Sequence, residues 1–406
     1  MITEYREYGT PSKVYLPLTD LKYKIANVHV SVGDKVLAGQ IVADKFKGKS
    51  KRSIISSVSG TVVSFEEKID RYGKYVDHIV IENNSKNEVV EVAKFADEVT
   101  PAQVRNRLIE FGIDTVSYDG LYTDVDFADP IKHVVVNAIY SNEPFVSTDY
   151  EFLSDNAEAI ADGIQLLGTA AYAETMTVIV DKFMPGAALD ALGKAIVDKN
   201  IELVSKDTRK AKGWDYKVIS KVAGKKVKGD LLAEGVLYVS VEAAMMVSDA
   251  VRKGLPPVSR QVAFTGDGLK VNAIYNVRIG TLFTDVVEDL DGYYAAEKMN
   301  LHVGNFLTGV QLSSDDFVLT QSVDSVNVAE FREEKEDVCI KCGDCNDVCP
   351  VGILPQNIMD AELRSVNARI VDLDTDKCIE CGLCTYVCPS KINVLEWVRR
   401  AKRRVG

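Results

Sequence analysis

All eight cysteines of the 406-residue chain lie in two short runs near its C-terminal end. The first run, CIKCGDCNDVCP, covers residues 339–350, and the second, CIECGLCTYVCP, covers residues 378–389. Each run has the spacing C-x2-C-x2-C-x3-C-P, which is that of bacterial ferredoxins, where thiolates hold iron–sulfur clusters. These residues at this spacing therefore indicate one-electron redox chemistry.

The two runs complement each other, because in a two-cluster ferredoxin the fourth cysteine of each run ligates the other cluster. The sequence predicts two [4Fe–4S] clusters. We expect one to be held by Cys339, Cys342, Cys345 and Cys388. We expect the other to be held by Cys378, Cys381, Cys384 and Cys349. Every iron then has a cysteine ligand, so the clusters are expected to transfer electrons, and no catalytic residue is predicted.

Zinc and disulfides are alternative uses of cysteine. Zinc tolerates C-x2-C pairs but does not require four cysteines in one run. Disulfides belong mainly to exported proteins, and the start MITEYREYGT lacks the basic and apolar segments of a secretory signal. Gly343 and Gly382 each follow the second cysteine of a run, where we expect the backbone to pass close to a cluster.

Composition limits the remaining possibilities. The net charge of −12 argues against a general nucleic-acid binder. The most apolar long stretch, LLAEGVLYVSVEAAMMV, contains two glutamates and is too polar for a membrane span. We expect a cytoplasmic protein without a direct membrane span, which can lie peripherally on the inner face of the cell membrane through partner proteins.

Several elements must position the cysteine runs. Residues 28–44 and 54–67 alternate apolar and polar side chains around Gly-Asp and Ser-Gly turns. They resemble the flattened β-barrel of biotinyl and lipoyl carriers. Further on, Thr100, Pro101 and Gln103 predict a capped helix start, and Gly112 predicts the helix end.

Strand and helix patterns then alternate. HVVVNAIY and MTVIVD read as buried strands separated by a long helical pattern, which indicates a parallel sheet. Beyond residue 255 the pattern predicts a hairpin, a turn at Gly280 and a helix. We therefore expect a multidomain α/β plus β protein. Its expected parts are a barrel-sandwich (lipoyl-like) β-module at 1–95, a Rossmann-like α/β domain at 96–254, a β-grasp (SLBB-like) domain at 255–330 and a helical 2[4Fe–4S] ferredoxin-type domain at 331–406.

This order of parts resembles the RnfC component of the Rnf electron transport complex and, more distantly, the 51-kDa NADH-oxidising subunit of complex I. The resemblance is carried by VGDKVLAGQ, VSGTV, NEPF near residue 143, IGT at 279–281, and CIECGLC with VCPSKI. In that family the α/β domain binds FMN and accepts hydride from NADH. Two clusters then pass single electrons to partner subunits.

The chain departs from the family at the flavin loop. The family loop reads G-x-G-G-A-x-F-P-T, whereas residues 112–125 read GIDTVSYDGLYTDV, with Thr115, Ser117 and Tyr118 in place of loop glycines. Glycine-rich loops bind phosphate through bare backbone N–H groups. The related segments IYSNEPF and VDKFMP have also lost family residues. The loop is therefore degenerate, and we expect no FMN in the usual mode and no cofactor-binding residues there.

The resemblance and its departures together predict an RnfC-like electron-transfer protein with redox proteins or Rnf-type membrane subunits as partners. It would pass electrons between a reduced donor and a partner reductase or membrane complex in an anaerobic cytoplasm. One alternative is an FMN-containing NADH-oxidising subunit of an Rnf-type complex. Another is a non-enzymatic iron–sulfur redox sensor or scaffold.

Two basic stretches allow two interpretations each. The C-terminal VRRAKRRVG favours either a helix dipole or the attraction of acidic redox partners. The lysine-rich residues 206–229 predict either a solvated loop or a docking patch for an acidic electron carrier.

Overall fold

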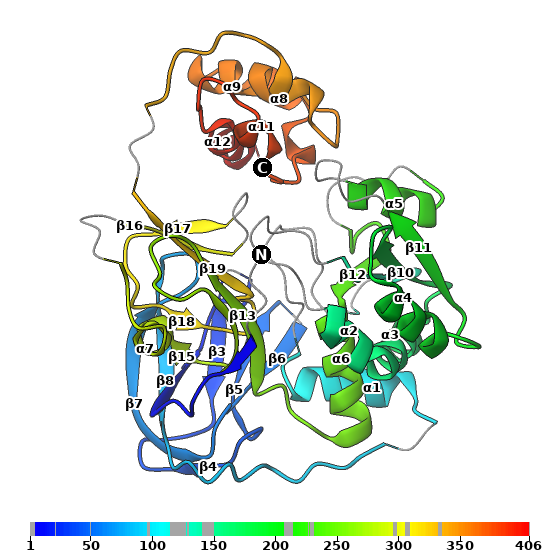
Figure 1. Cartoon of the computed structure of the whole chain (residues 1–406), viewed down its shortest axis with the longest axis vertical. Coiled ribbons are helices and arrows are strands. Elements are labelled where there is room, and N and C mark those ends of the chain that lie inside the picture. Colours follow the sequence, from blue (N-terminus) through cyan, green and yellow to red (C-terminus); the bar gives the residue numbers. More distant parts are fainter. Residues whose placement is uncertain are drawn as a thin grey trace.

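The computed structural model of the chain describes residues 5–20, 22–48, 50–95, 98–113, 127, 130–139, 150–206, 214–225, 227, 231–294, 299–304, 309–331 and 335–405. Figure 1 shows an N-terminal β-rich part, an α/β part beside it, a second β-rich part and a helical C-terminal part above them. In the part of the chain that the structure describes, no helix combines the length and apolar character needed to cross a bilayer.

The N-terminal part is built from two small antiparallel sheets. Their strands are β2 (Lys13–Pro17), β3 (Ile25–Val28), β4 (Lys35–Val36), β5 (Ile41–Lys47), β6 (Ser50–Ile55), β7 (Gly60–Ile69) and β8 (Tyr75–Asn83). The strand orders are β2-β8-β7-β4 and β3-β5-β6. Val14, Val42, Val62 and Ile79 from both sheets are fully buried against each other. The alternating pattern in the sequence thus becomes one apolar face per sheet.

The second β-rich part contains a six-stranded sheet, a two-stranded sheet and one helix. Its elements are β13 (Ser259–Thr265), β14 (Ala273–Arg278), β15 (Thr281–Leu282), α7 (Phe283–Asp289), β16 (Met299–Val303), β17 (Val310–Leu312), β18 (Val318–Leu319) and β19 (Ser325–Glu330). The predicted hairpin is β13–β14, and the predicted turn at Gly280 has a positive φ of 95°. The first strand of the chain, β1 (Tyr5–Glu7), joins this sheet in parallel with β14.

The α/β part has a parallel sheet in the order β11-β10-β9-β12. Its elements are α1 (Pro101–Glu110), β9 (His133–Asn137), α2 (Tyr150–Asp155), α3 (Ala157–Ala171), β10 (Thr175–Asp181), α4 (Gly186–Ala195), β11 (Ile201–Lys206), α5 (Trp214–Val222), β12 (Val236–Ser240), α6 (Val241–Ser248) and a π-helix (Asp249–Lys253). Val134 and Val136 face the core under α1, α3 and α6, while Val135 faces a second core with Ile219 of α5. The sheet is therefore buried on both faces, as its apolar strands predict.

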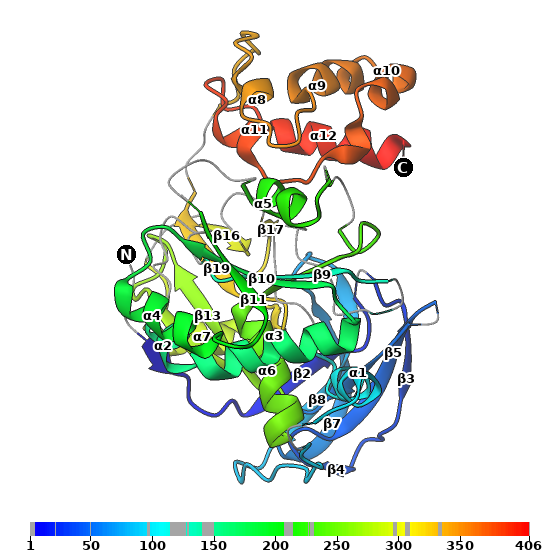
Figure 2. The same cartoon turned by 90° about the vertical axis from the view of Figure 1, so that its right-hand side faces the viewer.

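The C-terminal part is made of short helices around one apolar core. They are α8 (Asp344–Asp347), α9 (Pro355–Leu363), α10 (Asn367–Asp372), a 3-10 turn (Thr375–Lys377), α11 (Leu383–Tyr386) and α12 (Val394–Val405). Ile358, Ile370 and Ala401 are completely buried in that core. Figure 2 shows this part lying over α5 and the α/β part. Ile379 packs against the core that contains Val135 and Ile219, which connects the two parts.

The two β-rich parts are also joined directly. The backbone N–H of Tyr15 donates to the carbonyl of Gly280 at 2.8 Å. Tyr15 and Val80 share a buried cluster with Leu282 and Val318. These contacts hold the N-terminal barrel against the second sheet, so the three upstream parts form a common base below the C-terminal helices (Figure 1).

Candidate metal centres

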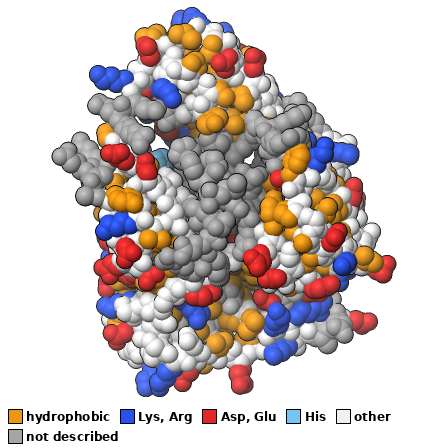
Figure 3. Space-filling model, in the orientation of Figure 1, with side chains coloured by type: hydrophobic (Ala, Val, Ile, Leu, Met, Phe, Trp, Pro, Cys, Tyr) orange, Lys and Arg blue, Asp and Glu red, His pale blue; other side chains and the backbone are white. Residues whose placement is uncertain are grey.

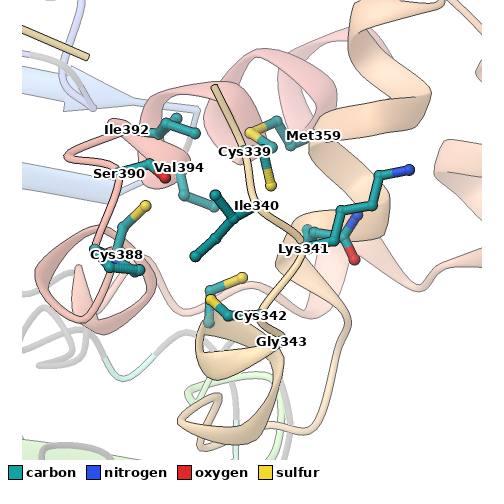
Figure 4. Close-up of a pocket in the computed structure, with 13 residues that line it drawn as sticks. Cys339, Ile340, Lys341, Cys342, Gly343, Met359, Cys388, Ser390, Ile392 and Val394 are labelled. Carbon is teal, nitrogen blue, oxygen red and sulfur yellow. The ribbon is translucent and has the colours of Figure 1, made fainter. Parts of the chain in front are cut away.

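Four cysteines surround a pocket in the outer half of the C-terminal part. The pocket has about 340 Å³ of space not filled by atoms. Its cysteines are Cys339, Cys342, Cys345 and Cys388. Figure 4 shows Cys339, Cys342 and Cys388 around this space, with Ile340 between them and the ammonium end of Lys341 directed away. Cys342 is exposed, so this pocket lies near solvent.

A second pocket of about 330 Å³ lies on the side of the α/β part. Its cysteines are Cys349, Cys378, Cys381 and Cys384. Cys384 is buried, and Ile379 in the same wall contacts the α/β core. Each pocket thus combines three cysteines of one run with the last cysteine of the other run. These are the same two sets that the sequence predicts to share a cluster.

The backbone takes the same conformation in both runs. Lys341 and Gly343 have φ values of 58° and 90°, and Glu380 and Gly382 have φ values of 55° and 77°. Left-handed φ values are unfavourable for a residue with a side chain and persist where the surroundings fix them, often at functional sites. A Cβ at position 343 would meet no protein atom within 4 Å, so space does not require glycine there. The positive φ of Gly343 does favour glycine, because side chains rarely tolerate it.

The donor set of each pocket fits an iron–sulfur cluster. Cysteines are the sole His, Cys, Asp or Glu side chains among the lining residues, and soft thiolates suit iron–sulfur clusters and zinc. Within the described ranges, no three His, Cys, Asp or Glu side chains are grouped as one metal ion would require. The thiols instead surround a volume, as ligands of a polynuclear cluster do, because each binds a different iron.

Burial controls the protonation of several of these thiols. Burial raises the pKa of Cys345, of Cys378 and of Cys384 above the usual value for a thiol. Nearby thiols add to the rise for Cys384. The backbone N–H of Glu380 donates to Sγ of Cys378 at 3.4 Å, which opposes the rise at that residue. Binding of a metal would release the thiol protons, and the positive charge of the metal would compensate the buried thiolates.

Helix α12 fastens the loop of the second cysteine run. Nζ of Lys402 donates to the carbonyl of Cys378 at 2.9 Å and to Oε1 of Glu380 at 3.1 Å. Nε of Arg399 donates to Oε2 of Glu380 at 2.9 Å. Burial alone would raise the pKa of Glu380, but the two cations outweigh it and hold that pKa below its usual value. The sequence motif gives no sign of this network, because its cations come from a helix outside both runs.

The other arginines of the basic tail also have carboxylate partners. Arg400 and Arg403 both contact Glu396 at 3.1 Å, and Arg404 contacts Glu362 at 2.7 Å. The two pairs with Glu396 lie within α12, and the pair of Arg404 with Glu362 joins α12 to α9. They account for the basic tail structurally and reduce the positive charge that it presents to an acidic partner.

The flavin-loop prediction falls mostly outside the described residues. Residues 114–125 and 140–145 are not described, nor are residues 207–213, 226 and 228–229 of the lysine-rich stretch. Gly112 is described, with φ at 60°, and a Cβ there would come within 2.2 Å of the Ser53 carbonyl oxygen on β6. Gly112 is therefore needed where the end of α1 meets the N-terminal barrel. In the third related segment, Asp181 ends β10 and Met184 is buried.

Comparison with known proteins places two segments of the chain in described families. Residues 3–86 match the RnfC barrel sandwich hybrid domain, and residues 338–392 match a 4Fe–4S dicluster domain. The first match covers the N-terminal barrel, and the second covers both cysteine runs. The match of residues 338–392 therefore supports iron–sulfur clusters as cofactors of the C-terminal part.

Two curated relatives extend the similarity along the chain. The RnfC-type component of a proton-translocating ferredoxin:NAD+ oxidoreductase complex from Clostridium ljungdahlii is 27% identical over 357 residues, which are 85% of this chain and 77% of the relative. The corresponding component of a Na+-translocating ferredoxin:NAD+ oxidoreductase complex from Acetobacterium woodii is 27% identical over 349 residues, covering 83% of this chain and 78% of the relative.

A solved NAD+-reducing [NiFe]-hydrogenase in the H2-reduced state aligns with a TM-score of 0.47 and 14% identity, over 75% of this chain and 63% of that chain. A TM-score this low supports no conclusion about fold or cofactor. The domain matches and the curated relatives are the informative findings. The chain is therefore similar to RnfC proteins over most of its length, and it contains segments that match a barrel sandwich hybrid domain and a 4Fe–4S dicluster domain.

Proposed function

We propose that this chain passes single electrons through two [4Fe–4S] clusters, between a reduced donor and a partner reductase or membrane complex. The observation that carries the proposal is the crossed arrangement of the cysteines, since each pocket receives the last cysteine of the opposite run. A crossed set gives four thiolates to each of two clusters, as in two-cluster ferredoxins. The clusters would supply one-electron redox chemistry.

In this proposal the chain's own residues hold the two clusters and shield them from water. One cluster is held by Cys339, Cys342, Cys345 and Cys388. The other is held by Cys378, Cys381, Cys384 and Cys349. Ile392 and Val394 line the first pocket, and Leu395 and Val398 line the second, so that apolar side chains limit the access of water.

The partners in this proposal follow from the curated relatives. Their names describe subunits of ion-translocating ferredoxin:NAD+ oxidoreductase complexes. We assign this chain the corresponding place, at the inner face of the cell membrane beside Rnf-type membrane subunits. Its electrons would be exchanged with other redox proteins.

The proposal does not include FMN bound in the family's usual mode. The exclusion of FMN is supported by the sequence of residues 112–125, where Thr115, Ser117 and Tyr118 stand at loop glycine positions. The packing of Gly112 on the N-terminal barrel adds a reason other than phosphate binding for the glycine that remains. We assign the α/β part to a Rossmann-like fold, from its parallel sheet, and the second β-rich part to a β-grasp (SLBB-like) fold.

Metal and flavin analysis of anaerobically prepared protein tests the proposal. We expect about eight iron and eight sulfide per chain, no stoichiometric FMN, and no zinc. The crossed ligation predicts a pattern among double variants. Cys388→Ser with Cys339→Ser damages one site, so about half of the iron remains, whereas Cys388→Ser with Cys378→Ser damages both sites.

The matched comparison is Cys349→Ser, because Cys349 lines the pocket of the second run although it belongs to the first run. With Cys378→Ser it should leave about half of the iron, and with Cys339→Ser almost none. The crossed ligand sets would be refuted if two substitutions in the same cysteine run left half of the iron and two substitutions in the same pocket removed nearly all of it. Zinc in place of iron would refute electron transfer.

A further inference from the structure

The two cysteine runs have matching positions but unlike surroundings. The residue after the first cysteine is isoleucine in both runs, Ile340 in the first and Ile379 in the second. Ile379 is partly buried against the apolar core of the α/β part. Ile340 is 68% exposed, and the neighbouring Val338 is 79% exposed. The same position in the repeat is thus a contact with the α/β part in one half, whereas in the other half it is exposed and lines the cysteine pocket.

The two runs also differ in the charge of the short helix that follows the glycine. Asp344 follows the glycine of the first run, where the second run has Leu383, which is 4% exposed. Asp347 lies at the other end of α8 and is also exposed. The half that faces solvent therefore has aspartates on its short helix, and the half that faces the α/β part has a buried leucine there.

We propose that Val338 and Ile340, together with the exposed Asp344 and Asp347 of the same cysteine run, form a docking lip for a redox protein whose contact face has an apolar centre and a basic rim. This inference rests on the proposed function, because it names the surface through which electrons would be exchanged with a partner. The lip adjoins the pocket of the exposed Cys342 (Figure 4). A partner on the lip would therefore approach the site that contains the exposed cysteine.

The charge around the lip selects the partner. Among the described residues of 335–350 and at Lys391, the exposed carboxylates are Glu336, Asp337, Asp344 and Asp347, and the exposed ammonium groups are Lys335, Lys341 and Lys391. The carboxylates outnumber the cations, and the ammonium end of Lys341 points away from the pocket. Figure 3 shows hydrophobic and acidic side chains next to each other on the C-terminal part. Small interfaces with an apolar centre and complementary charges are typical of transient redox complexes.

Cytochrome c is a suitable probe, because lysines surround its exposed haem edge. Binding of oxidised cytochrome c to the oxidised chain at low ionic strength measures docking without electron transfer. We expect Val338→Ser to weaken binding about threefold and Asp344→Lys with Asp347→Lys about tenfold. Ile340 is kept in these variants, because it also lines the cysteine pocket. Matched controls on the α/β part are Val197→Ser, at a residue 62% exposed, and Asp155→Lys with Glu158→Lys.

Electron transfer provides the second measurement. When the reduced chain gives one electron to cytochrome c, the chain is oxidised by one electron and ferric haem becomes ferrous, with no bond made or broken. The lip variants should slow this step by the same factors, while electron transfer to the small one-electron acceptor ferrocenium stays unchanged. Raising the salt concentration should slow the wild-type reaction with cytochrome c and affect the aspartate variant much less.

Lip variants that bind cytochrome c as tightly as the wild type would overturn the docking lip, as would control variants that weaken binding equally. Tighter binding of an acidic probe, plastocyanin, than of cytochrome c would also overturn it. A reduced wild-type chain that binds cytochrome c through the lip but cannot reduce ferrocenium would contradict the proposed function and leave the lip intact.

Discussion

At the residue scale, His78 shows how burial alone sets a protonation state. It lies on β8 with no exposed surface, and its Nδ1 donates to the Val76 carbonyl at 2.8 Å. Its Nε2 is buried with no hydrogen-bond partner among the described residues. Burial lowers the pKa of His78 to about 4, because a second proton would place an unsolvated charge inside the barrel.

This pKa predicts a loss of stability in acid. The histidine pKa in the unfolded chain is about 6.5, so between that value and about 4 the unfolded chain binds more protons. The stabilisation is complete above about pH 6.5 and falls as the pH is lowered, by about 2 to 3 kcal/mol at about pH 4.5. His78→Asn keeps a donor for the Val76 carbonyl and removes the titrating group. Urea unfolding of both proteins across this range should show a smaller acid loss in the variant; equal slopes would contradict the prediction.

Lys402 predicts an effect on one of two reduction potentials. Its ammonium group contacts the loop of the second cysteine run, and a nearby positive charge stabilises the more negative, reduced form of a cluster. Lys402→Met should lower one midpoint potential by tens of millivolts and leave the other unchanged in a redox titration followed by electron paramagnetic resonance. Arg403→Met is the control, because Arg403 pairs with Glu396 at the surface. Equal shifts in both potentials would show that the charge does not act locally.

At the scale of elements, α3 and α6 cross at a position that only glycine fits. A Cβ on Gly163 would lie 1.8 Å from the backbone oxygen of Ala244. Glycine in a helix usually destabilises it relative to alanine, so its presence here reflects the close approach of two backbones. Asp162, next to it, contacts Arg252 and Ser248 across the same crossing.

The crossing predicts opposite effects for the same substitution at two glycines. Gly163→Ala should destabilise the α/β part by about 1 to 3 kcal/mol, because the helices must separate. Gly193→Ala in α4 should instead stabilise it by up to about 1 kcal/mol, since a Cβ there meets nothing within 4 Å. Thermal unfolding of the two variants measures the difference. A stabilised Gly163→Ala variant would show that the crossing is looser than described.

Elements with local signals could be predicted from the sequence. The capping box of α1 is present, with the Thr100 hydroxyl accepting from Gln103 N–H and the Gln103 side chain accepting from Thr100 N–H. The strand at 133–137 and the helix at 157–171 also lie where their patterns predict. The grouping of the cysteines follows the repeat in the same way. These features depend on residues close in sequence or on a known spacing.

At the scale of the whole molecule, contacts between distant segments could not be predicted in this way. Strand β1 pairs with β14, which lies far along the chain, and nothing in YRE distinguishes one sheet edge from another. The sequence also contains two equivalent isoleucines, Ile340 and Ile379, and does not tell which one faces another part of the chain. Both outcomes depend on the three-dimensional surroundings, which a periodic pattern does not encode.

These isoleucines provide a test of how the molecule is assembled. Ile379→Asp would place a carboxylate against the core of the α/β part, which is unfavourable without a partner, whereas Ile340→Asp would place it in solvent. We expect Ile379→Asp to loosen the C-terminal part, raising the radius of gyration in solution scattering and the hydrogen exchange of β12. Ile340→Asp should change neither quantity. Ile340 and Ile379 also line the cysteine pockets, so only preparations of both variants with full iron content are compared. If the two variants scatter alike at full iron content, the C-terminal part is held mainly by other contacts, and Ile379 does not position the second site beside the α/β part.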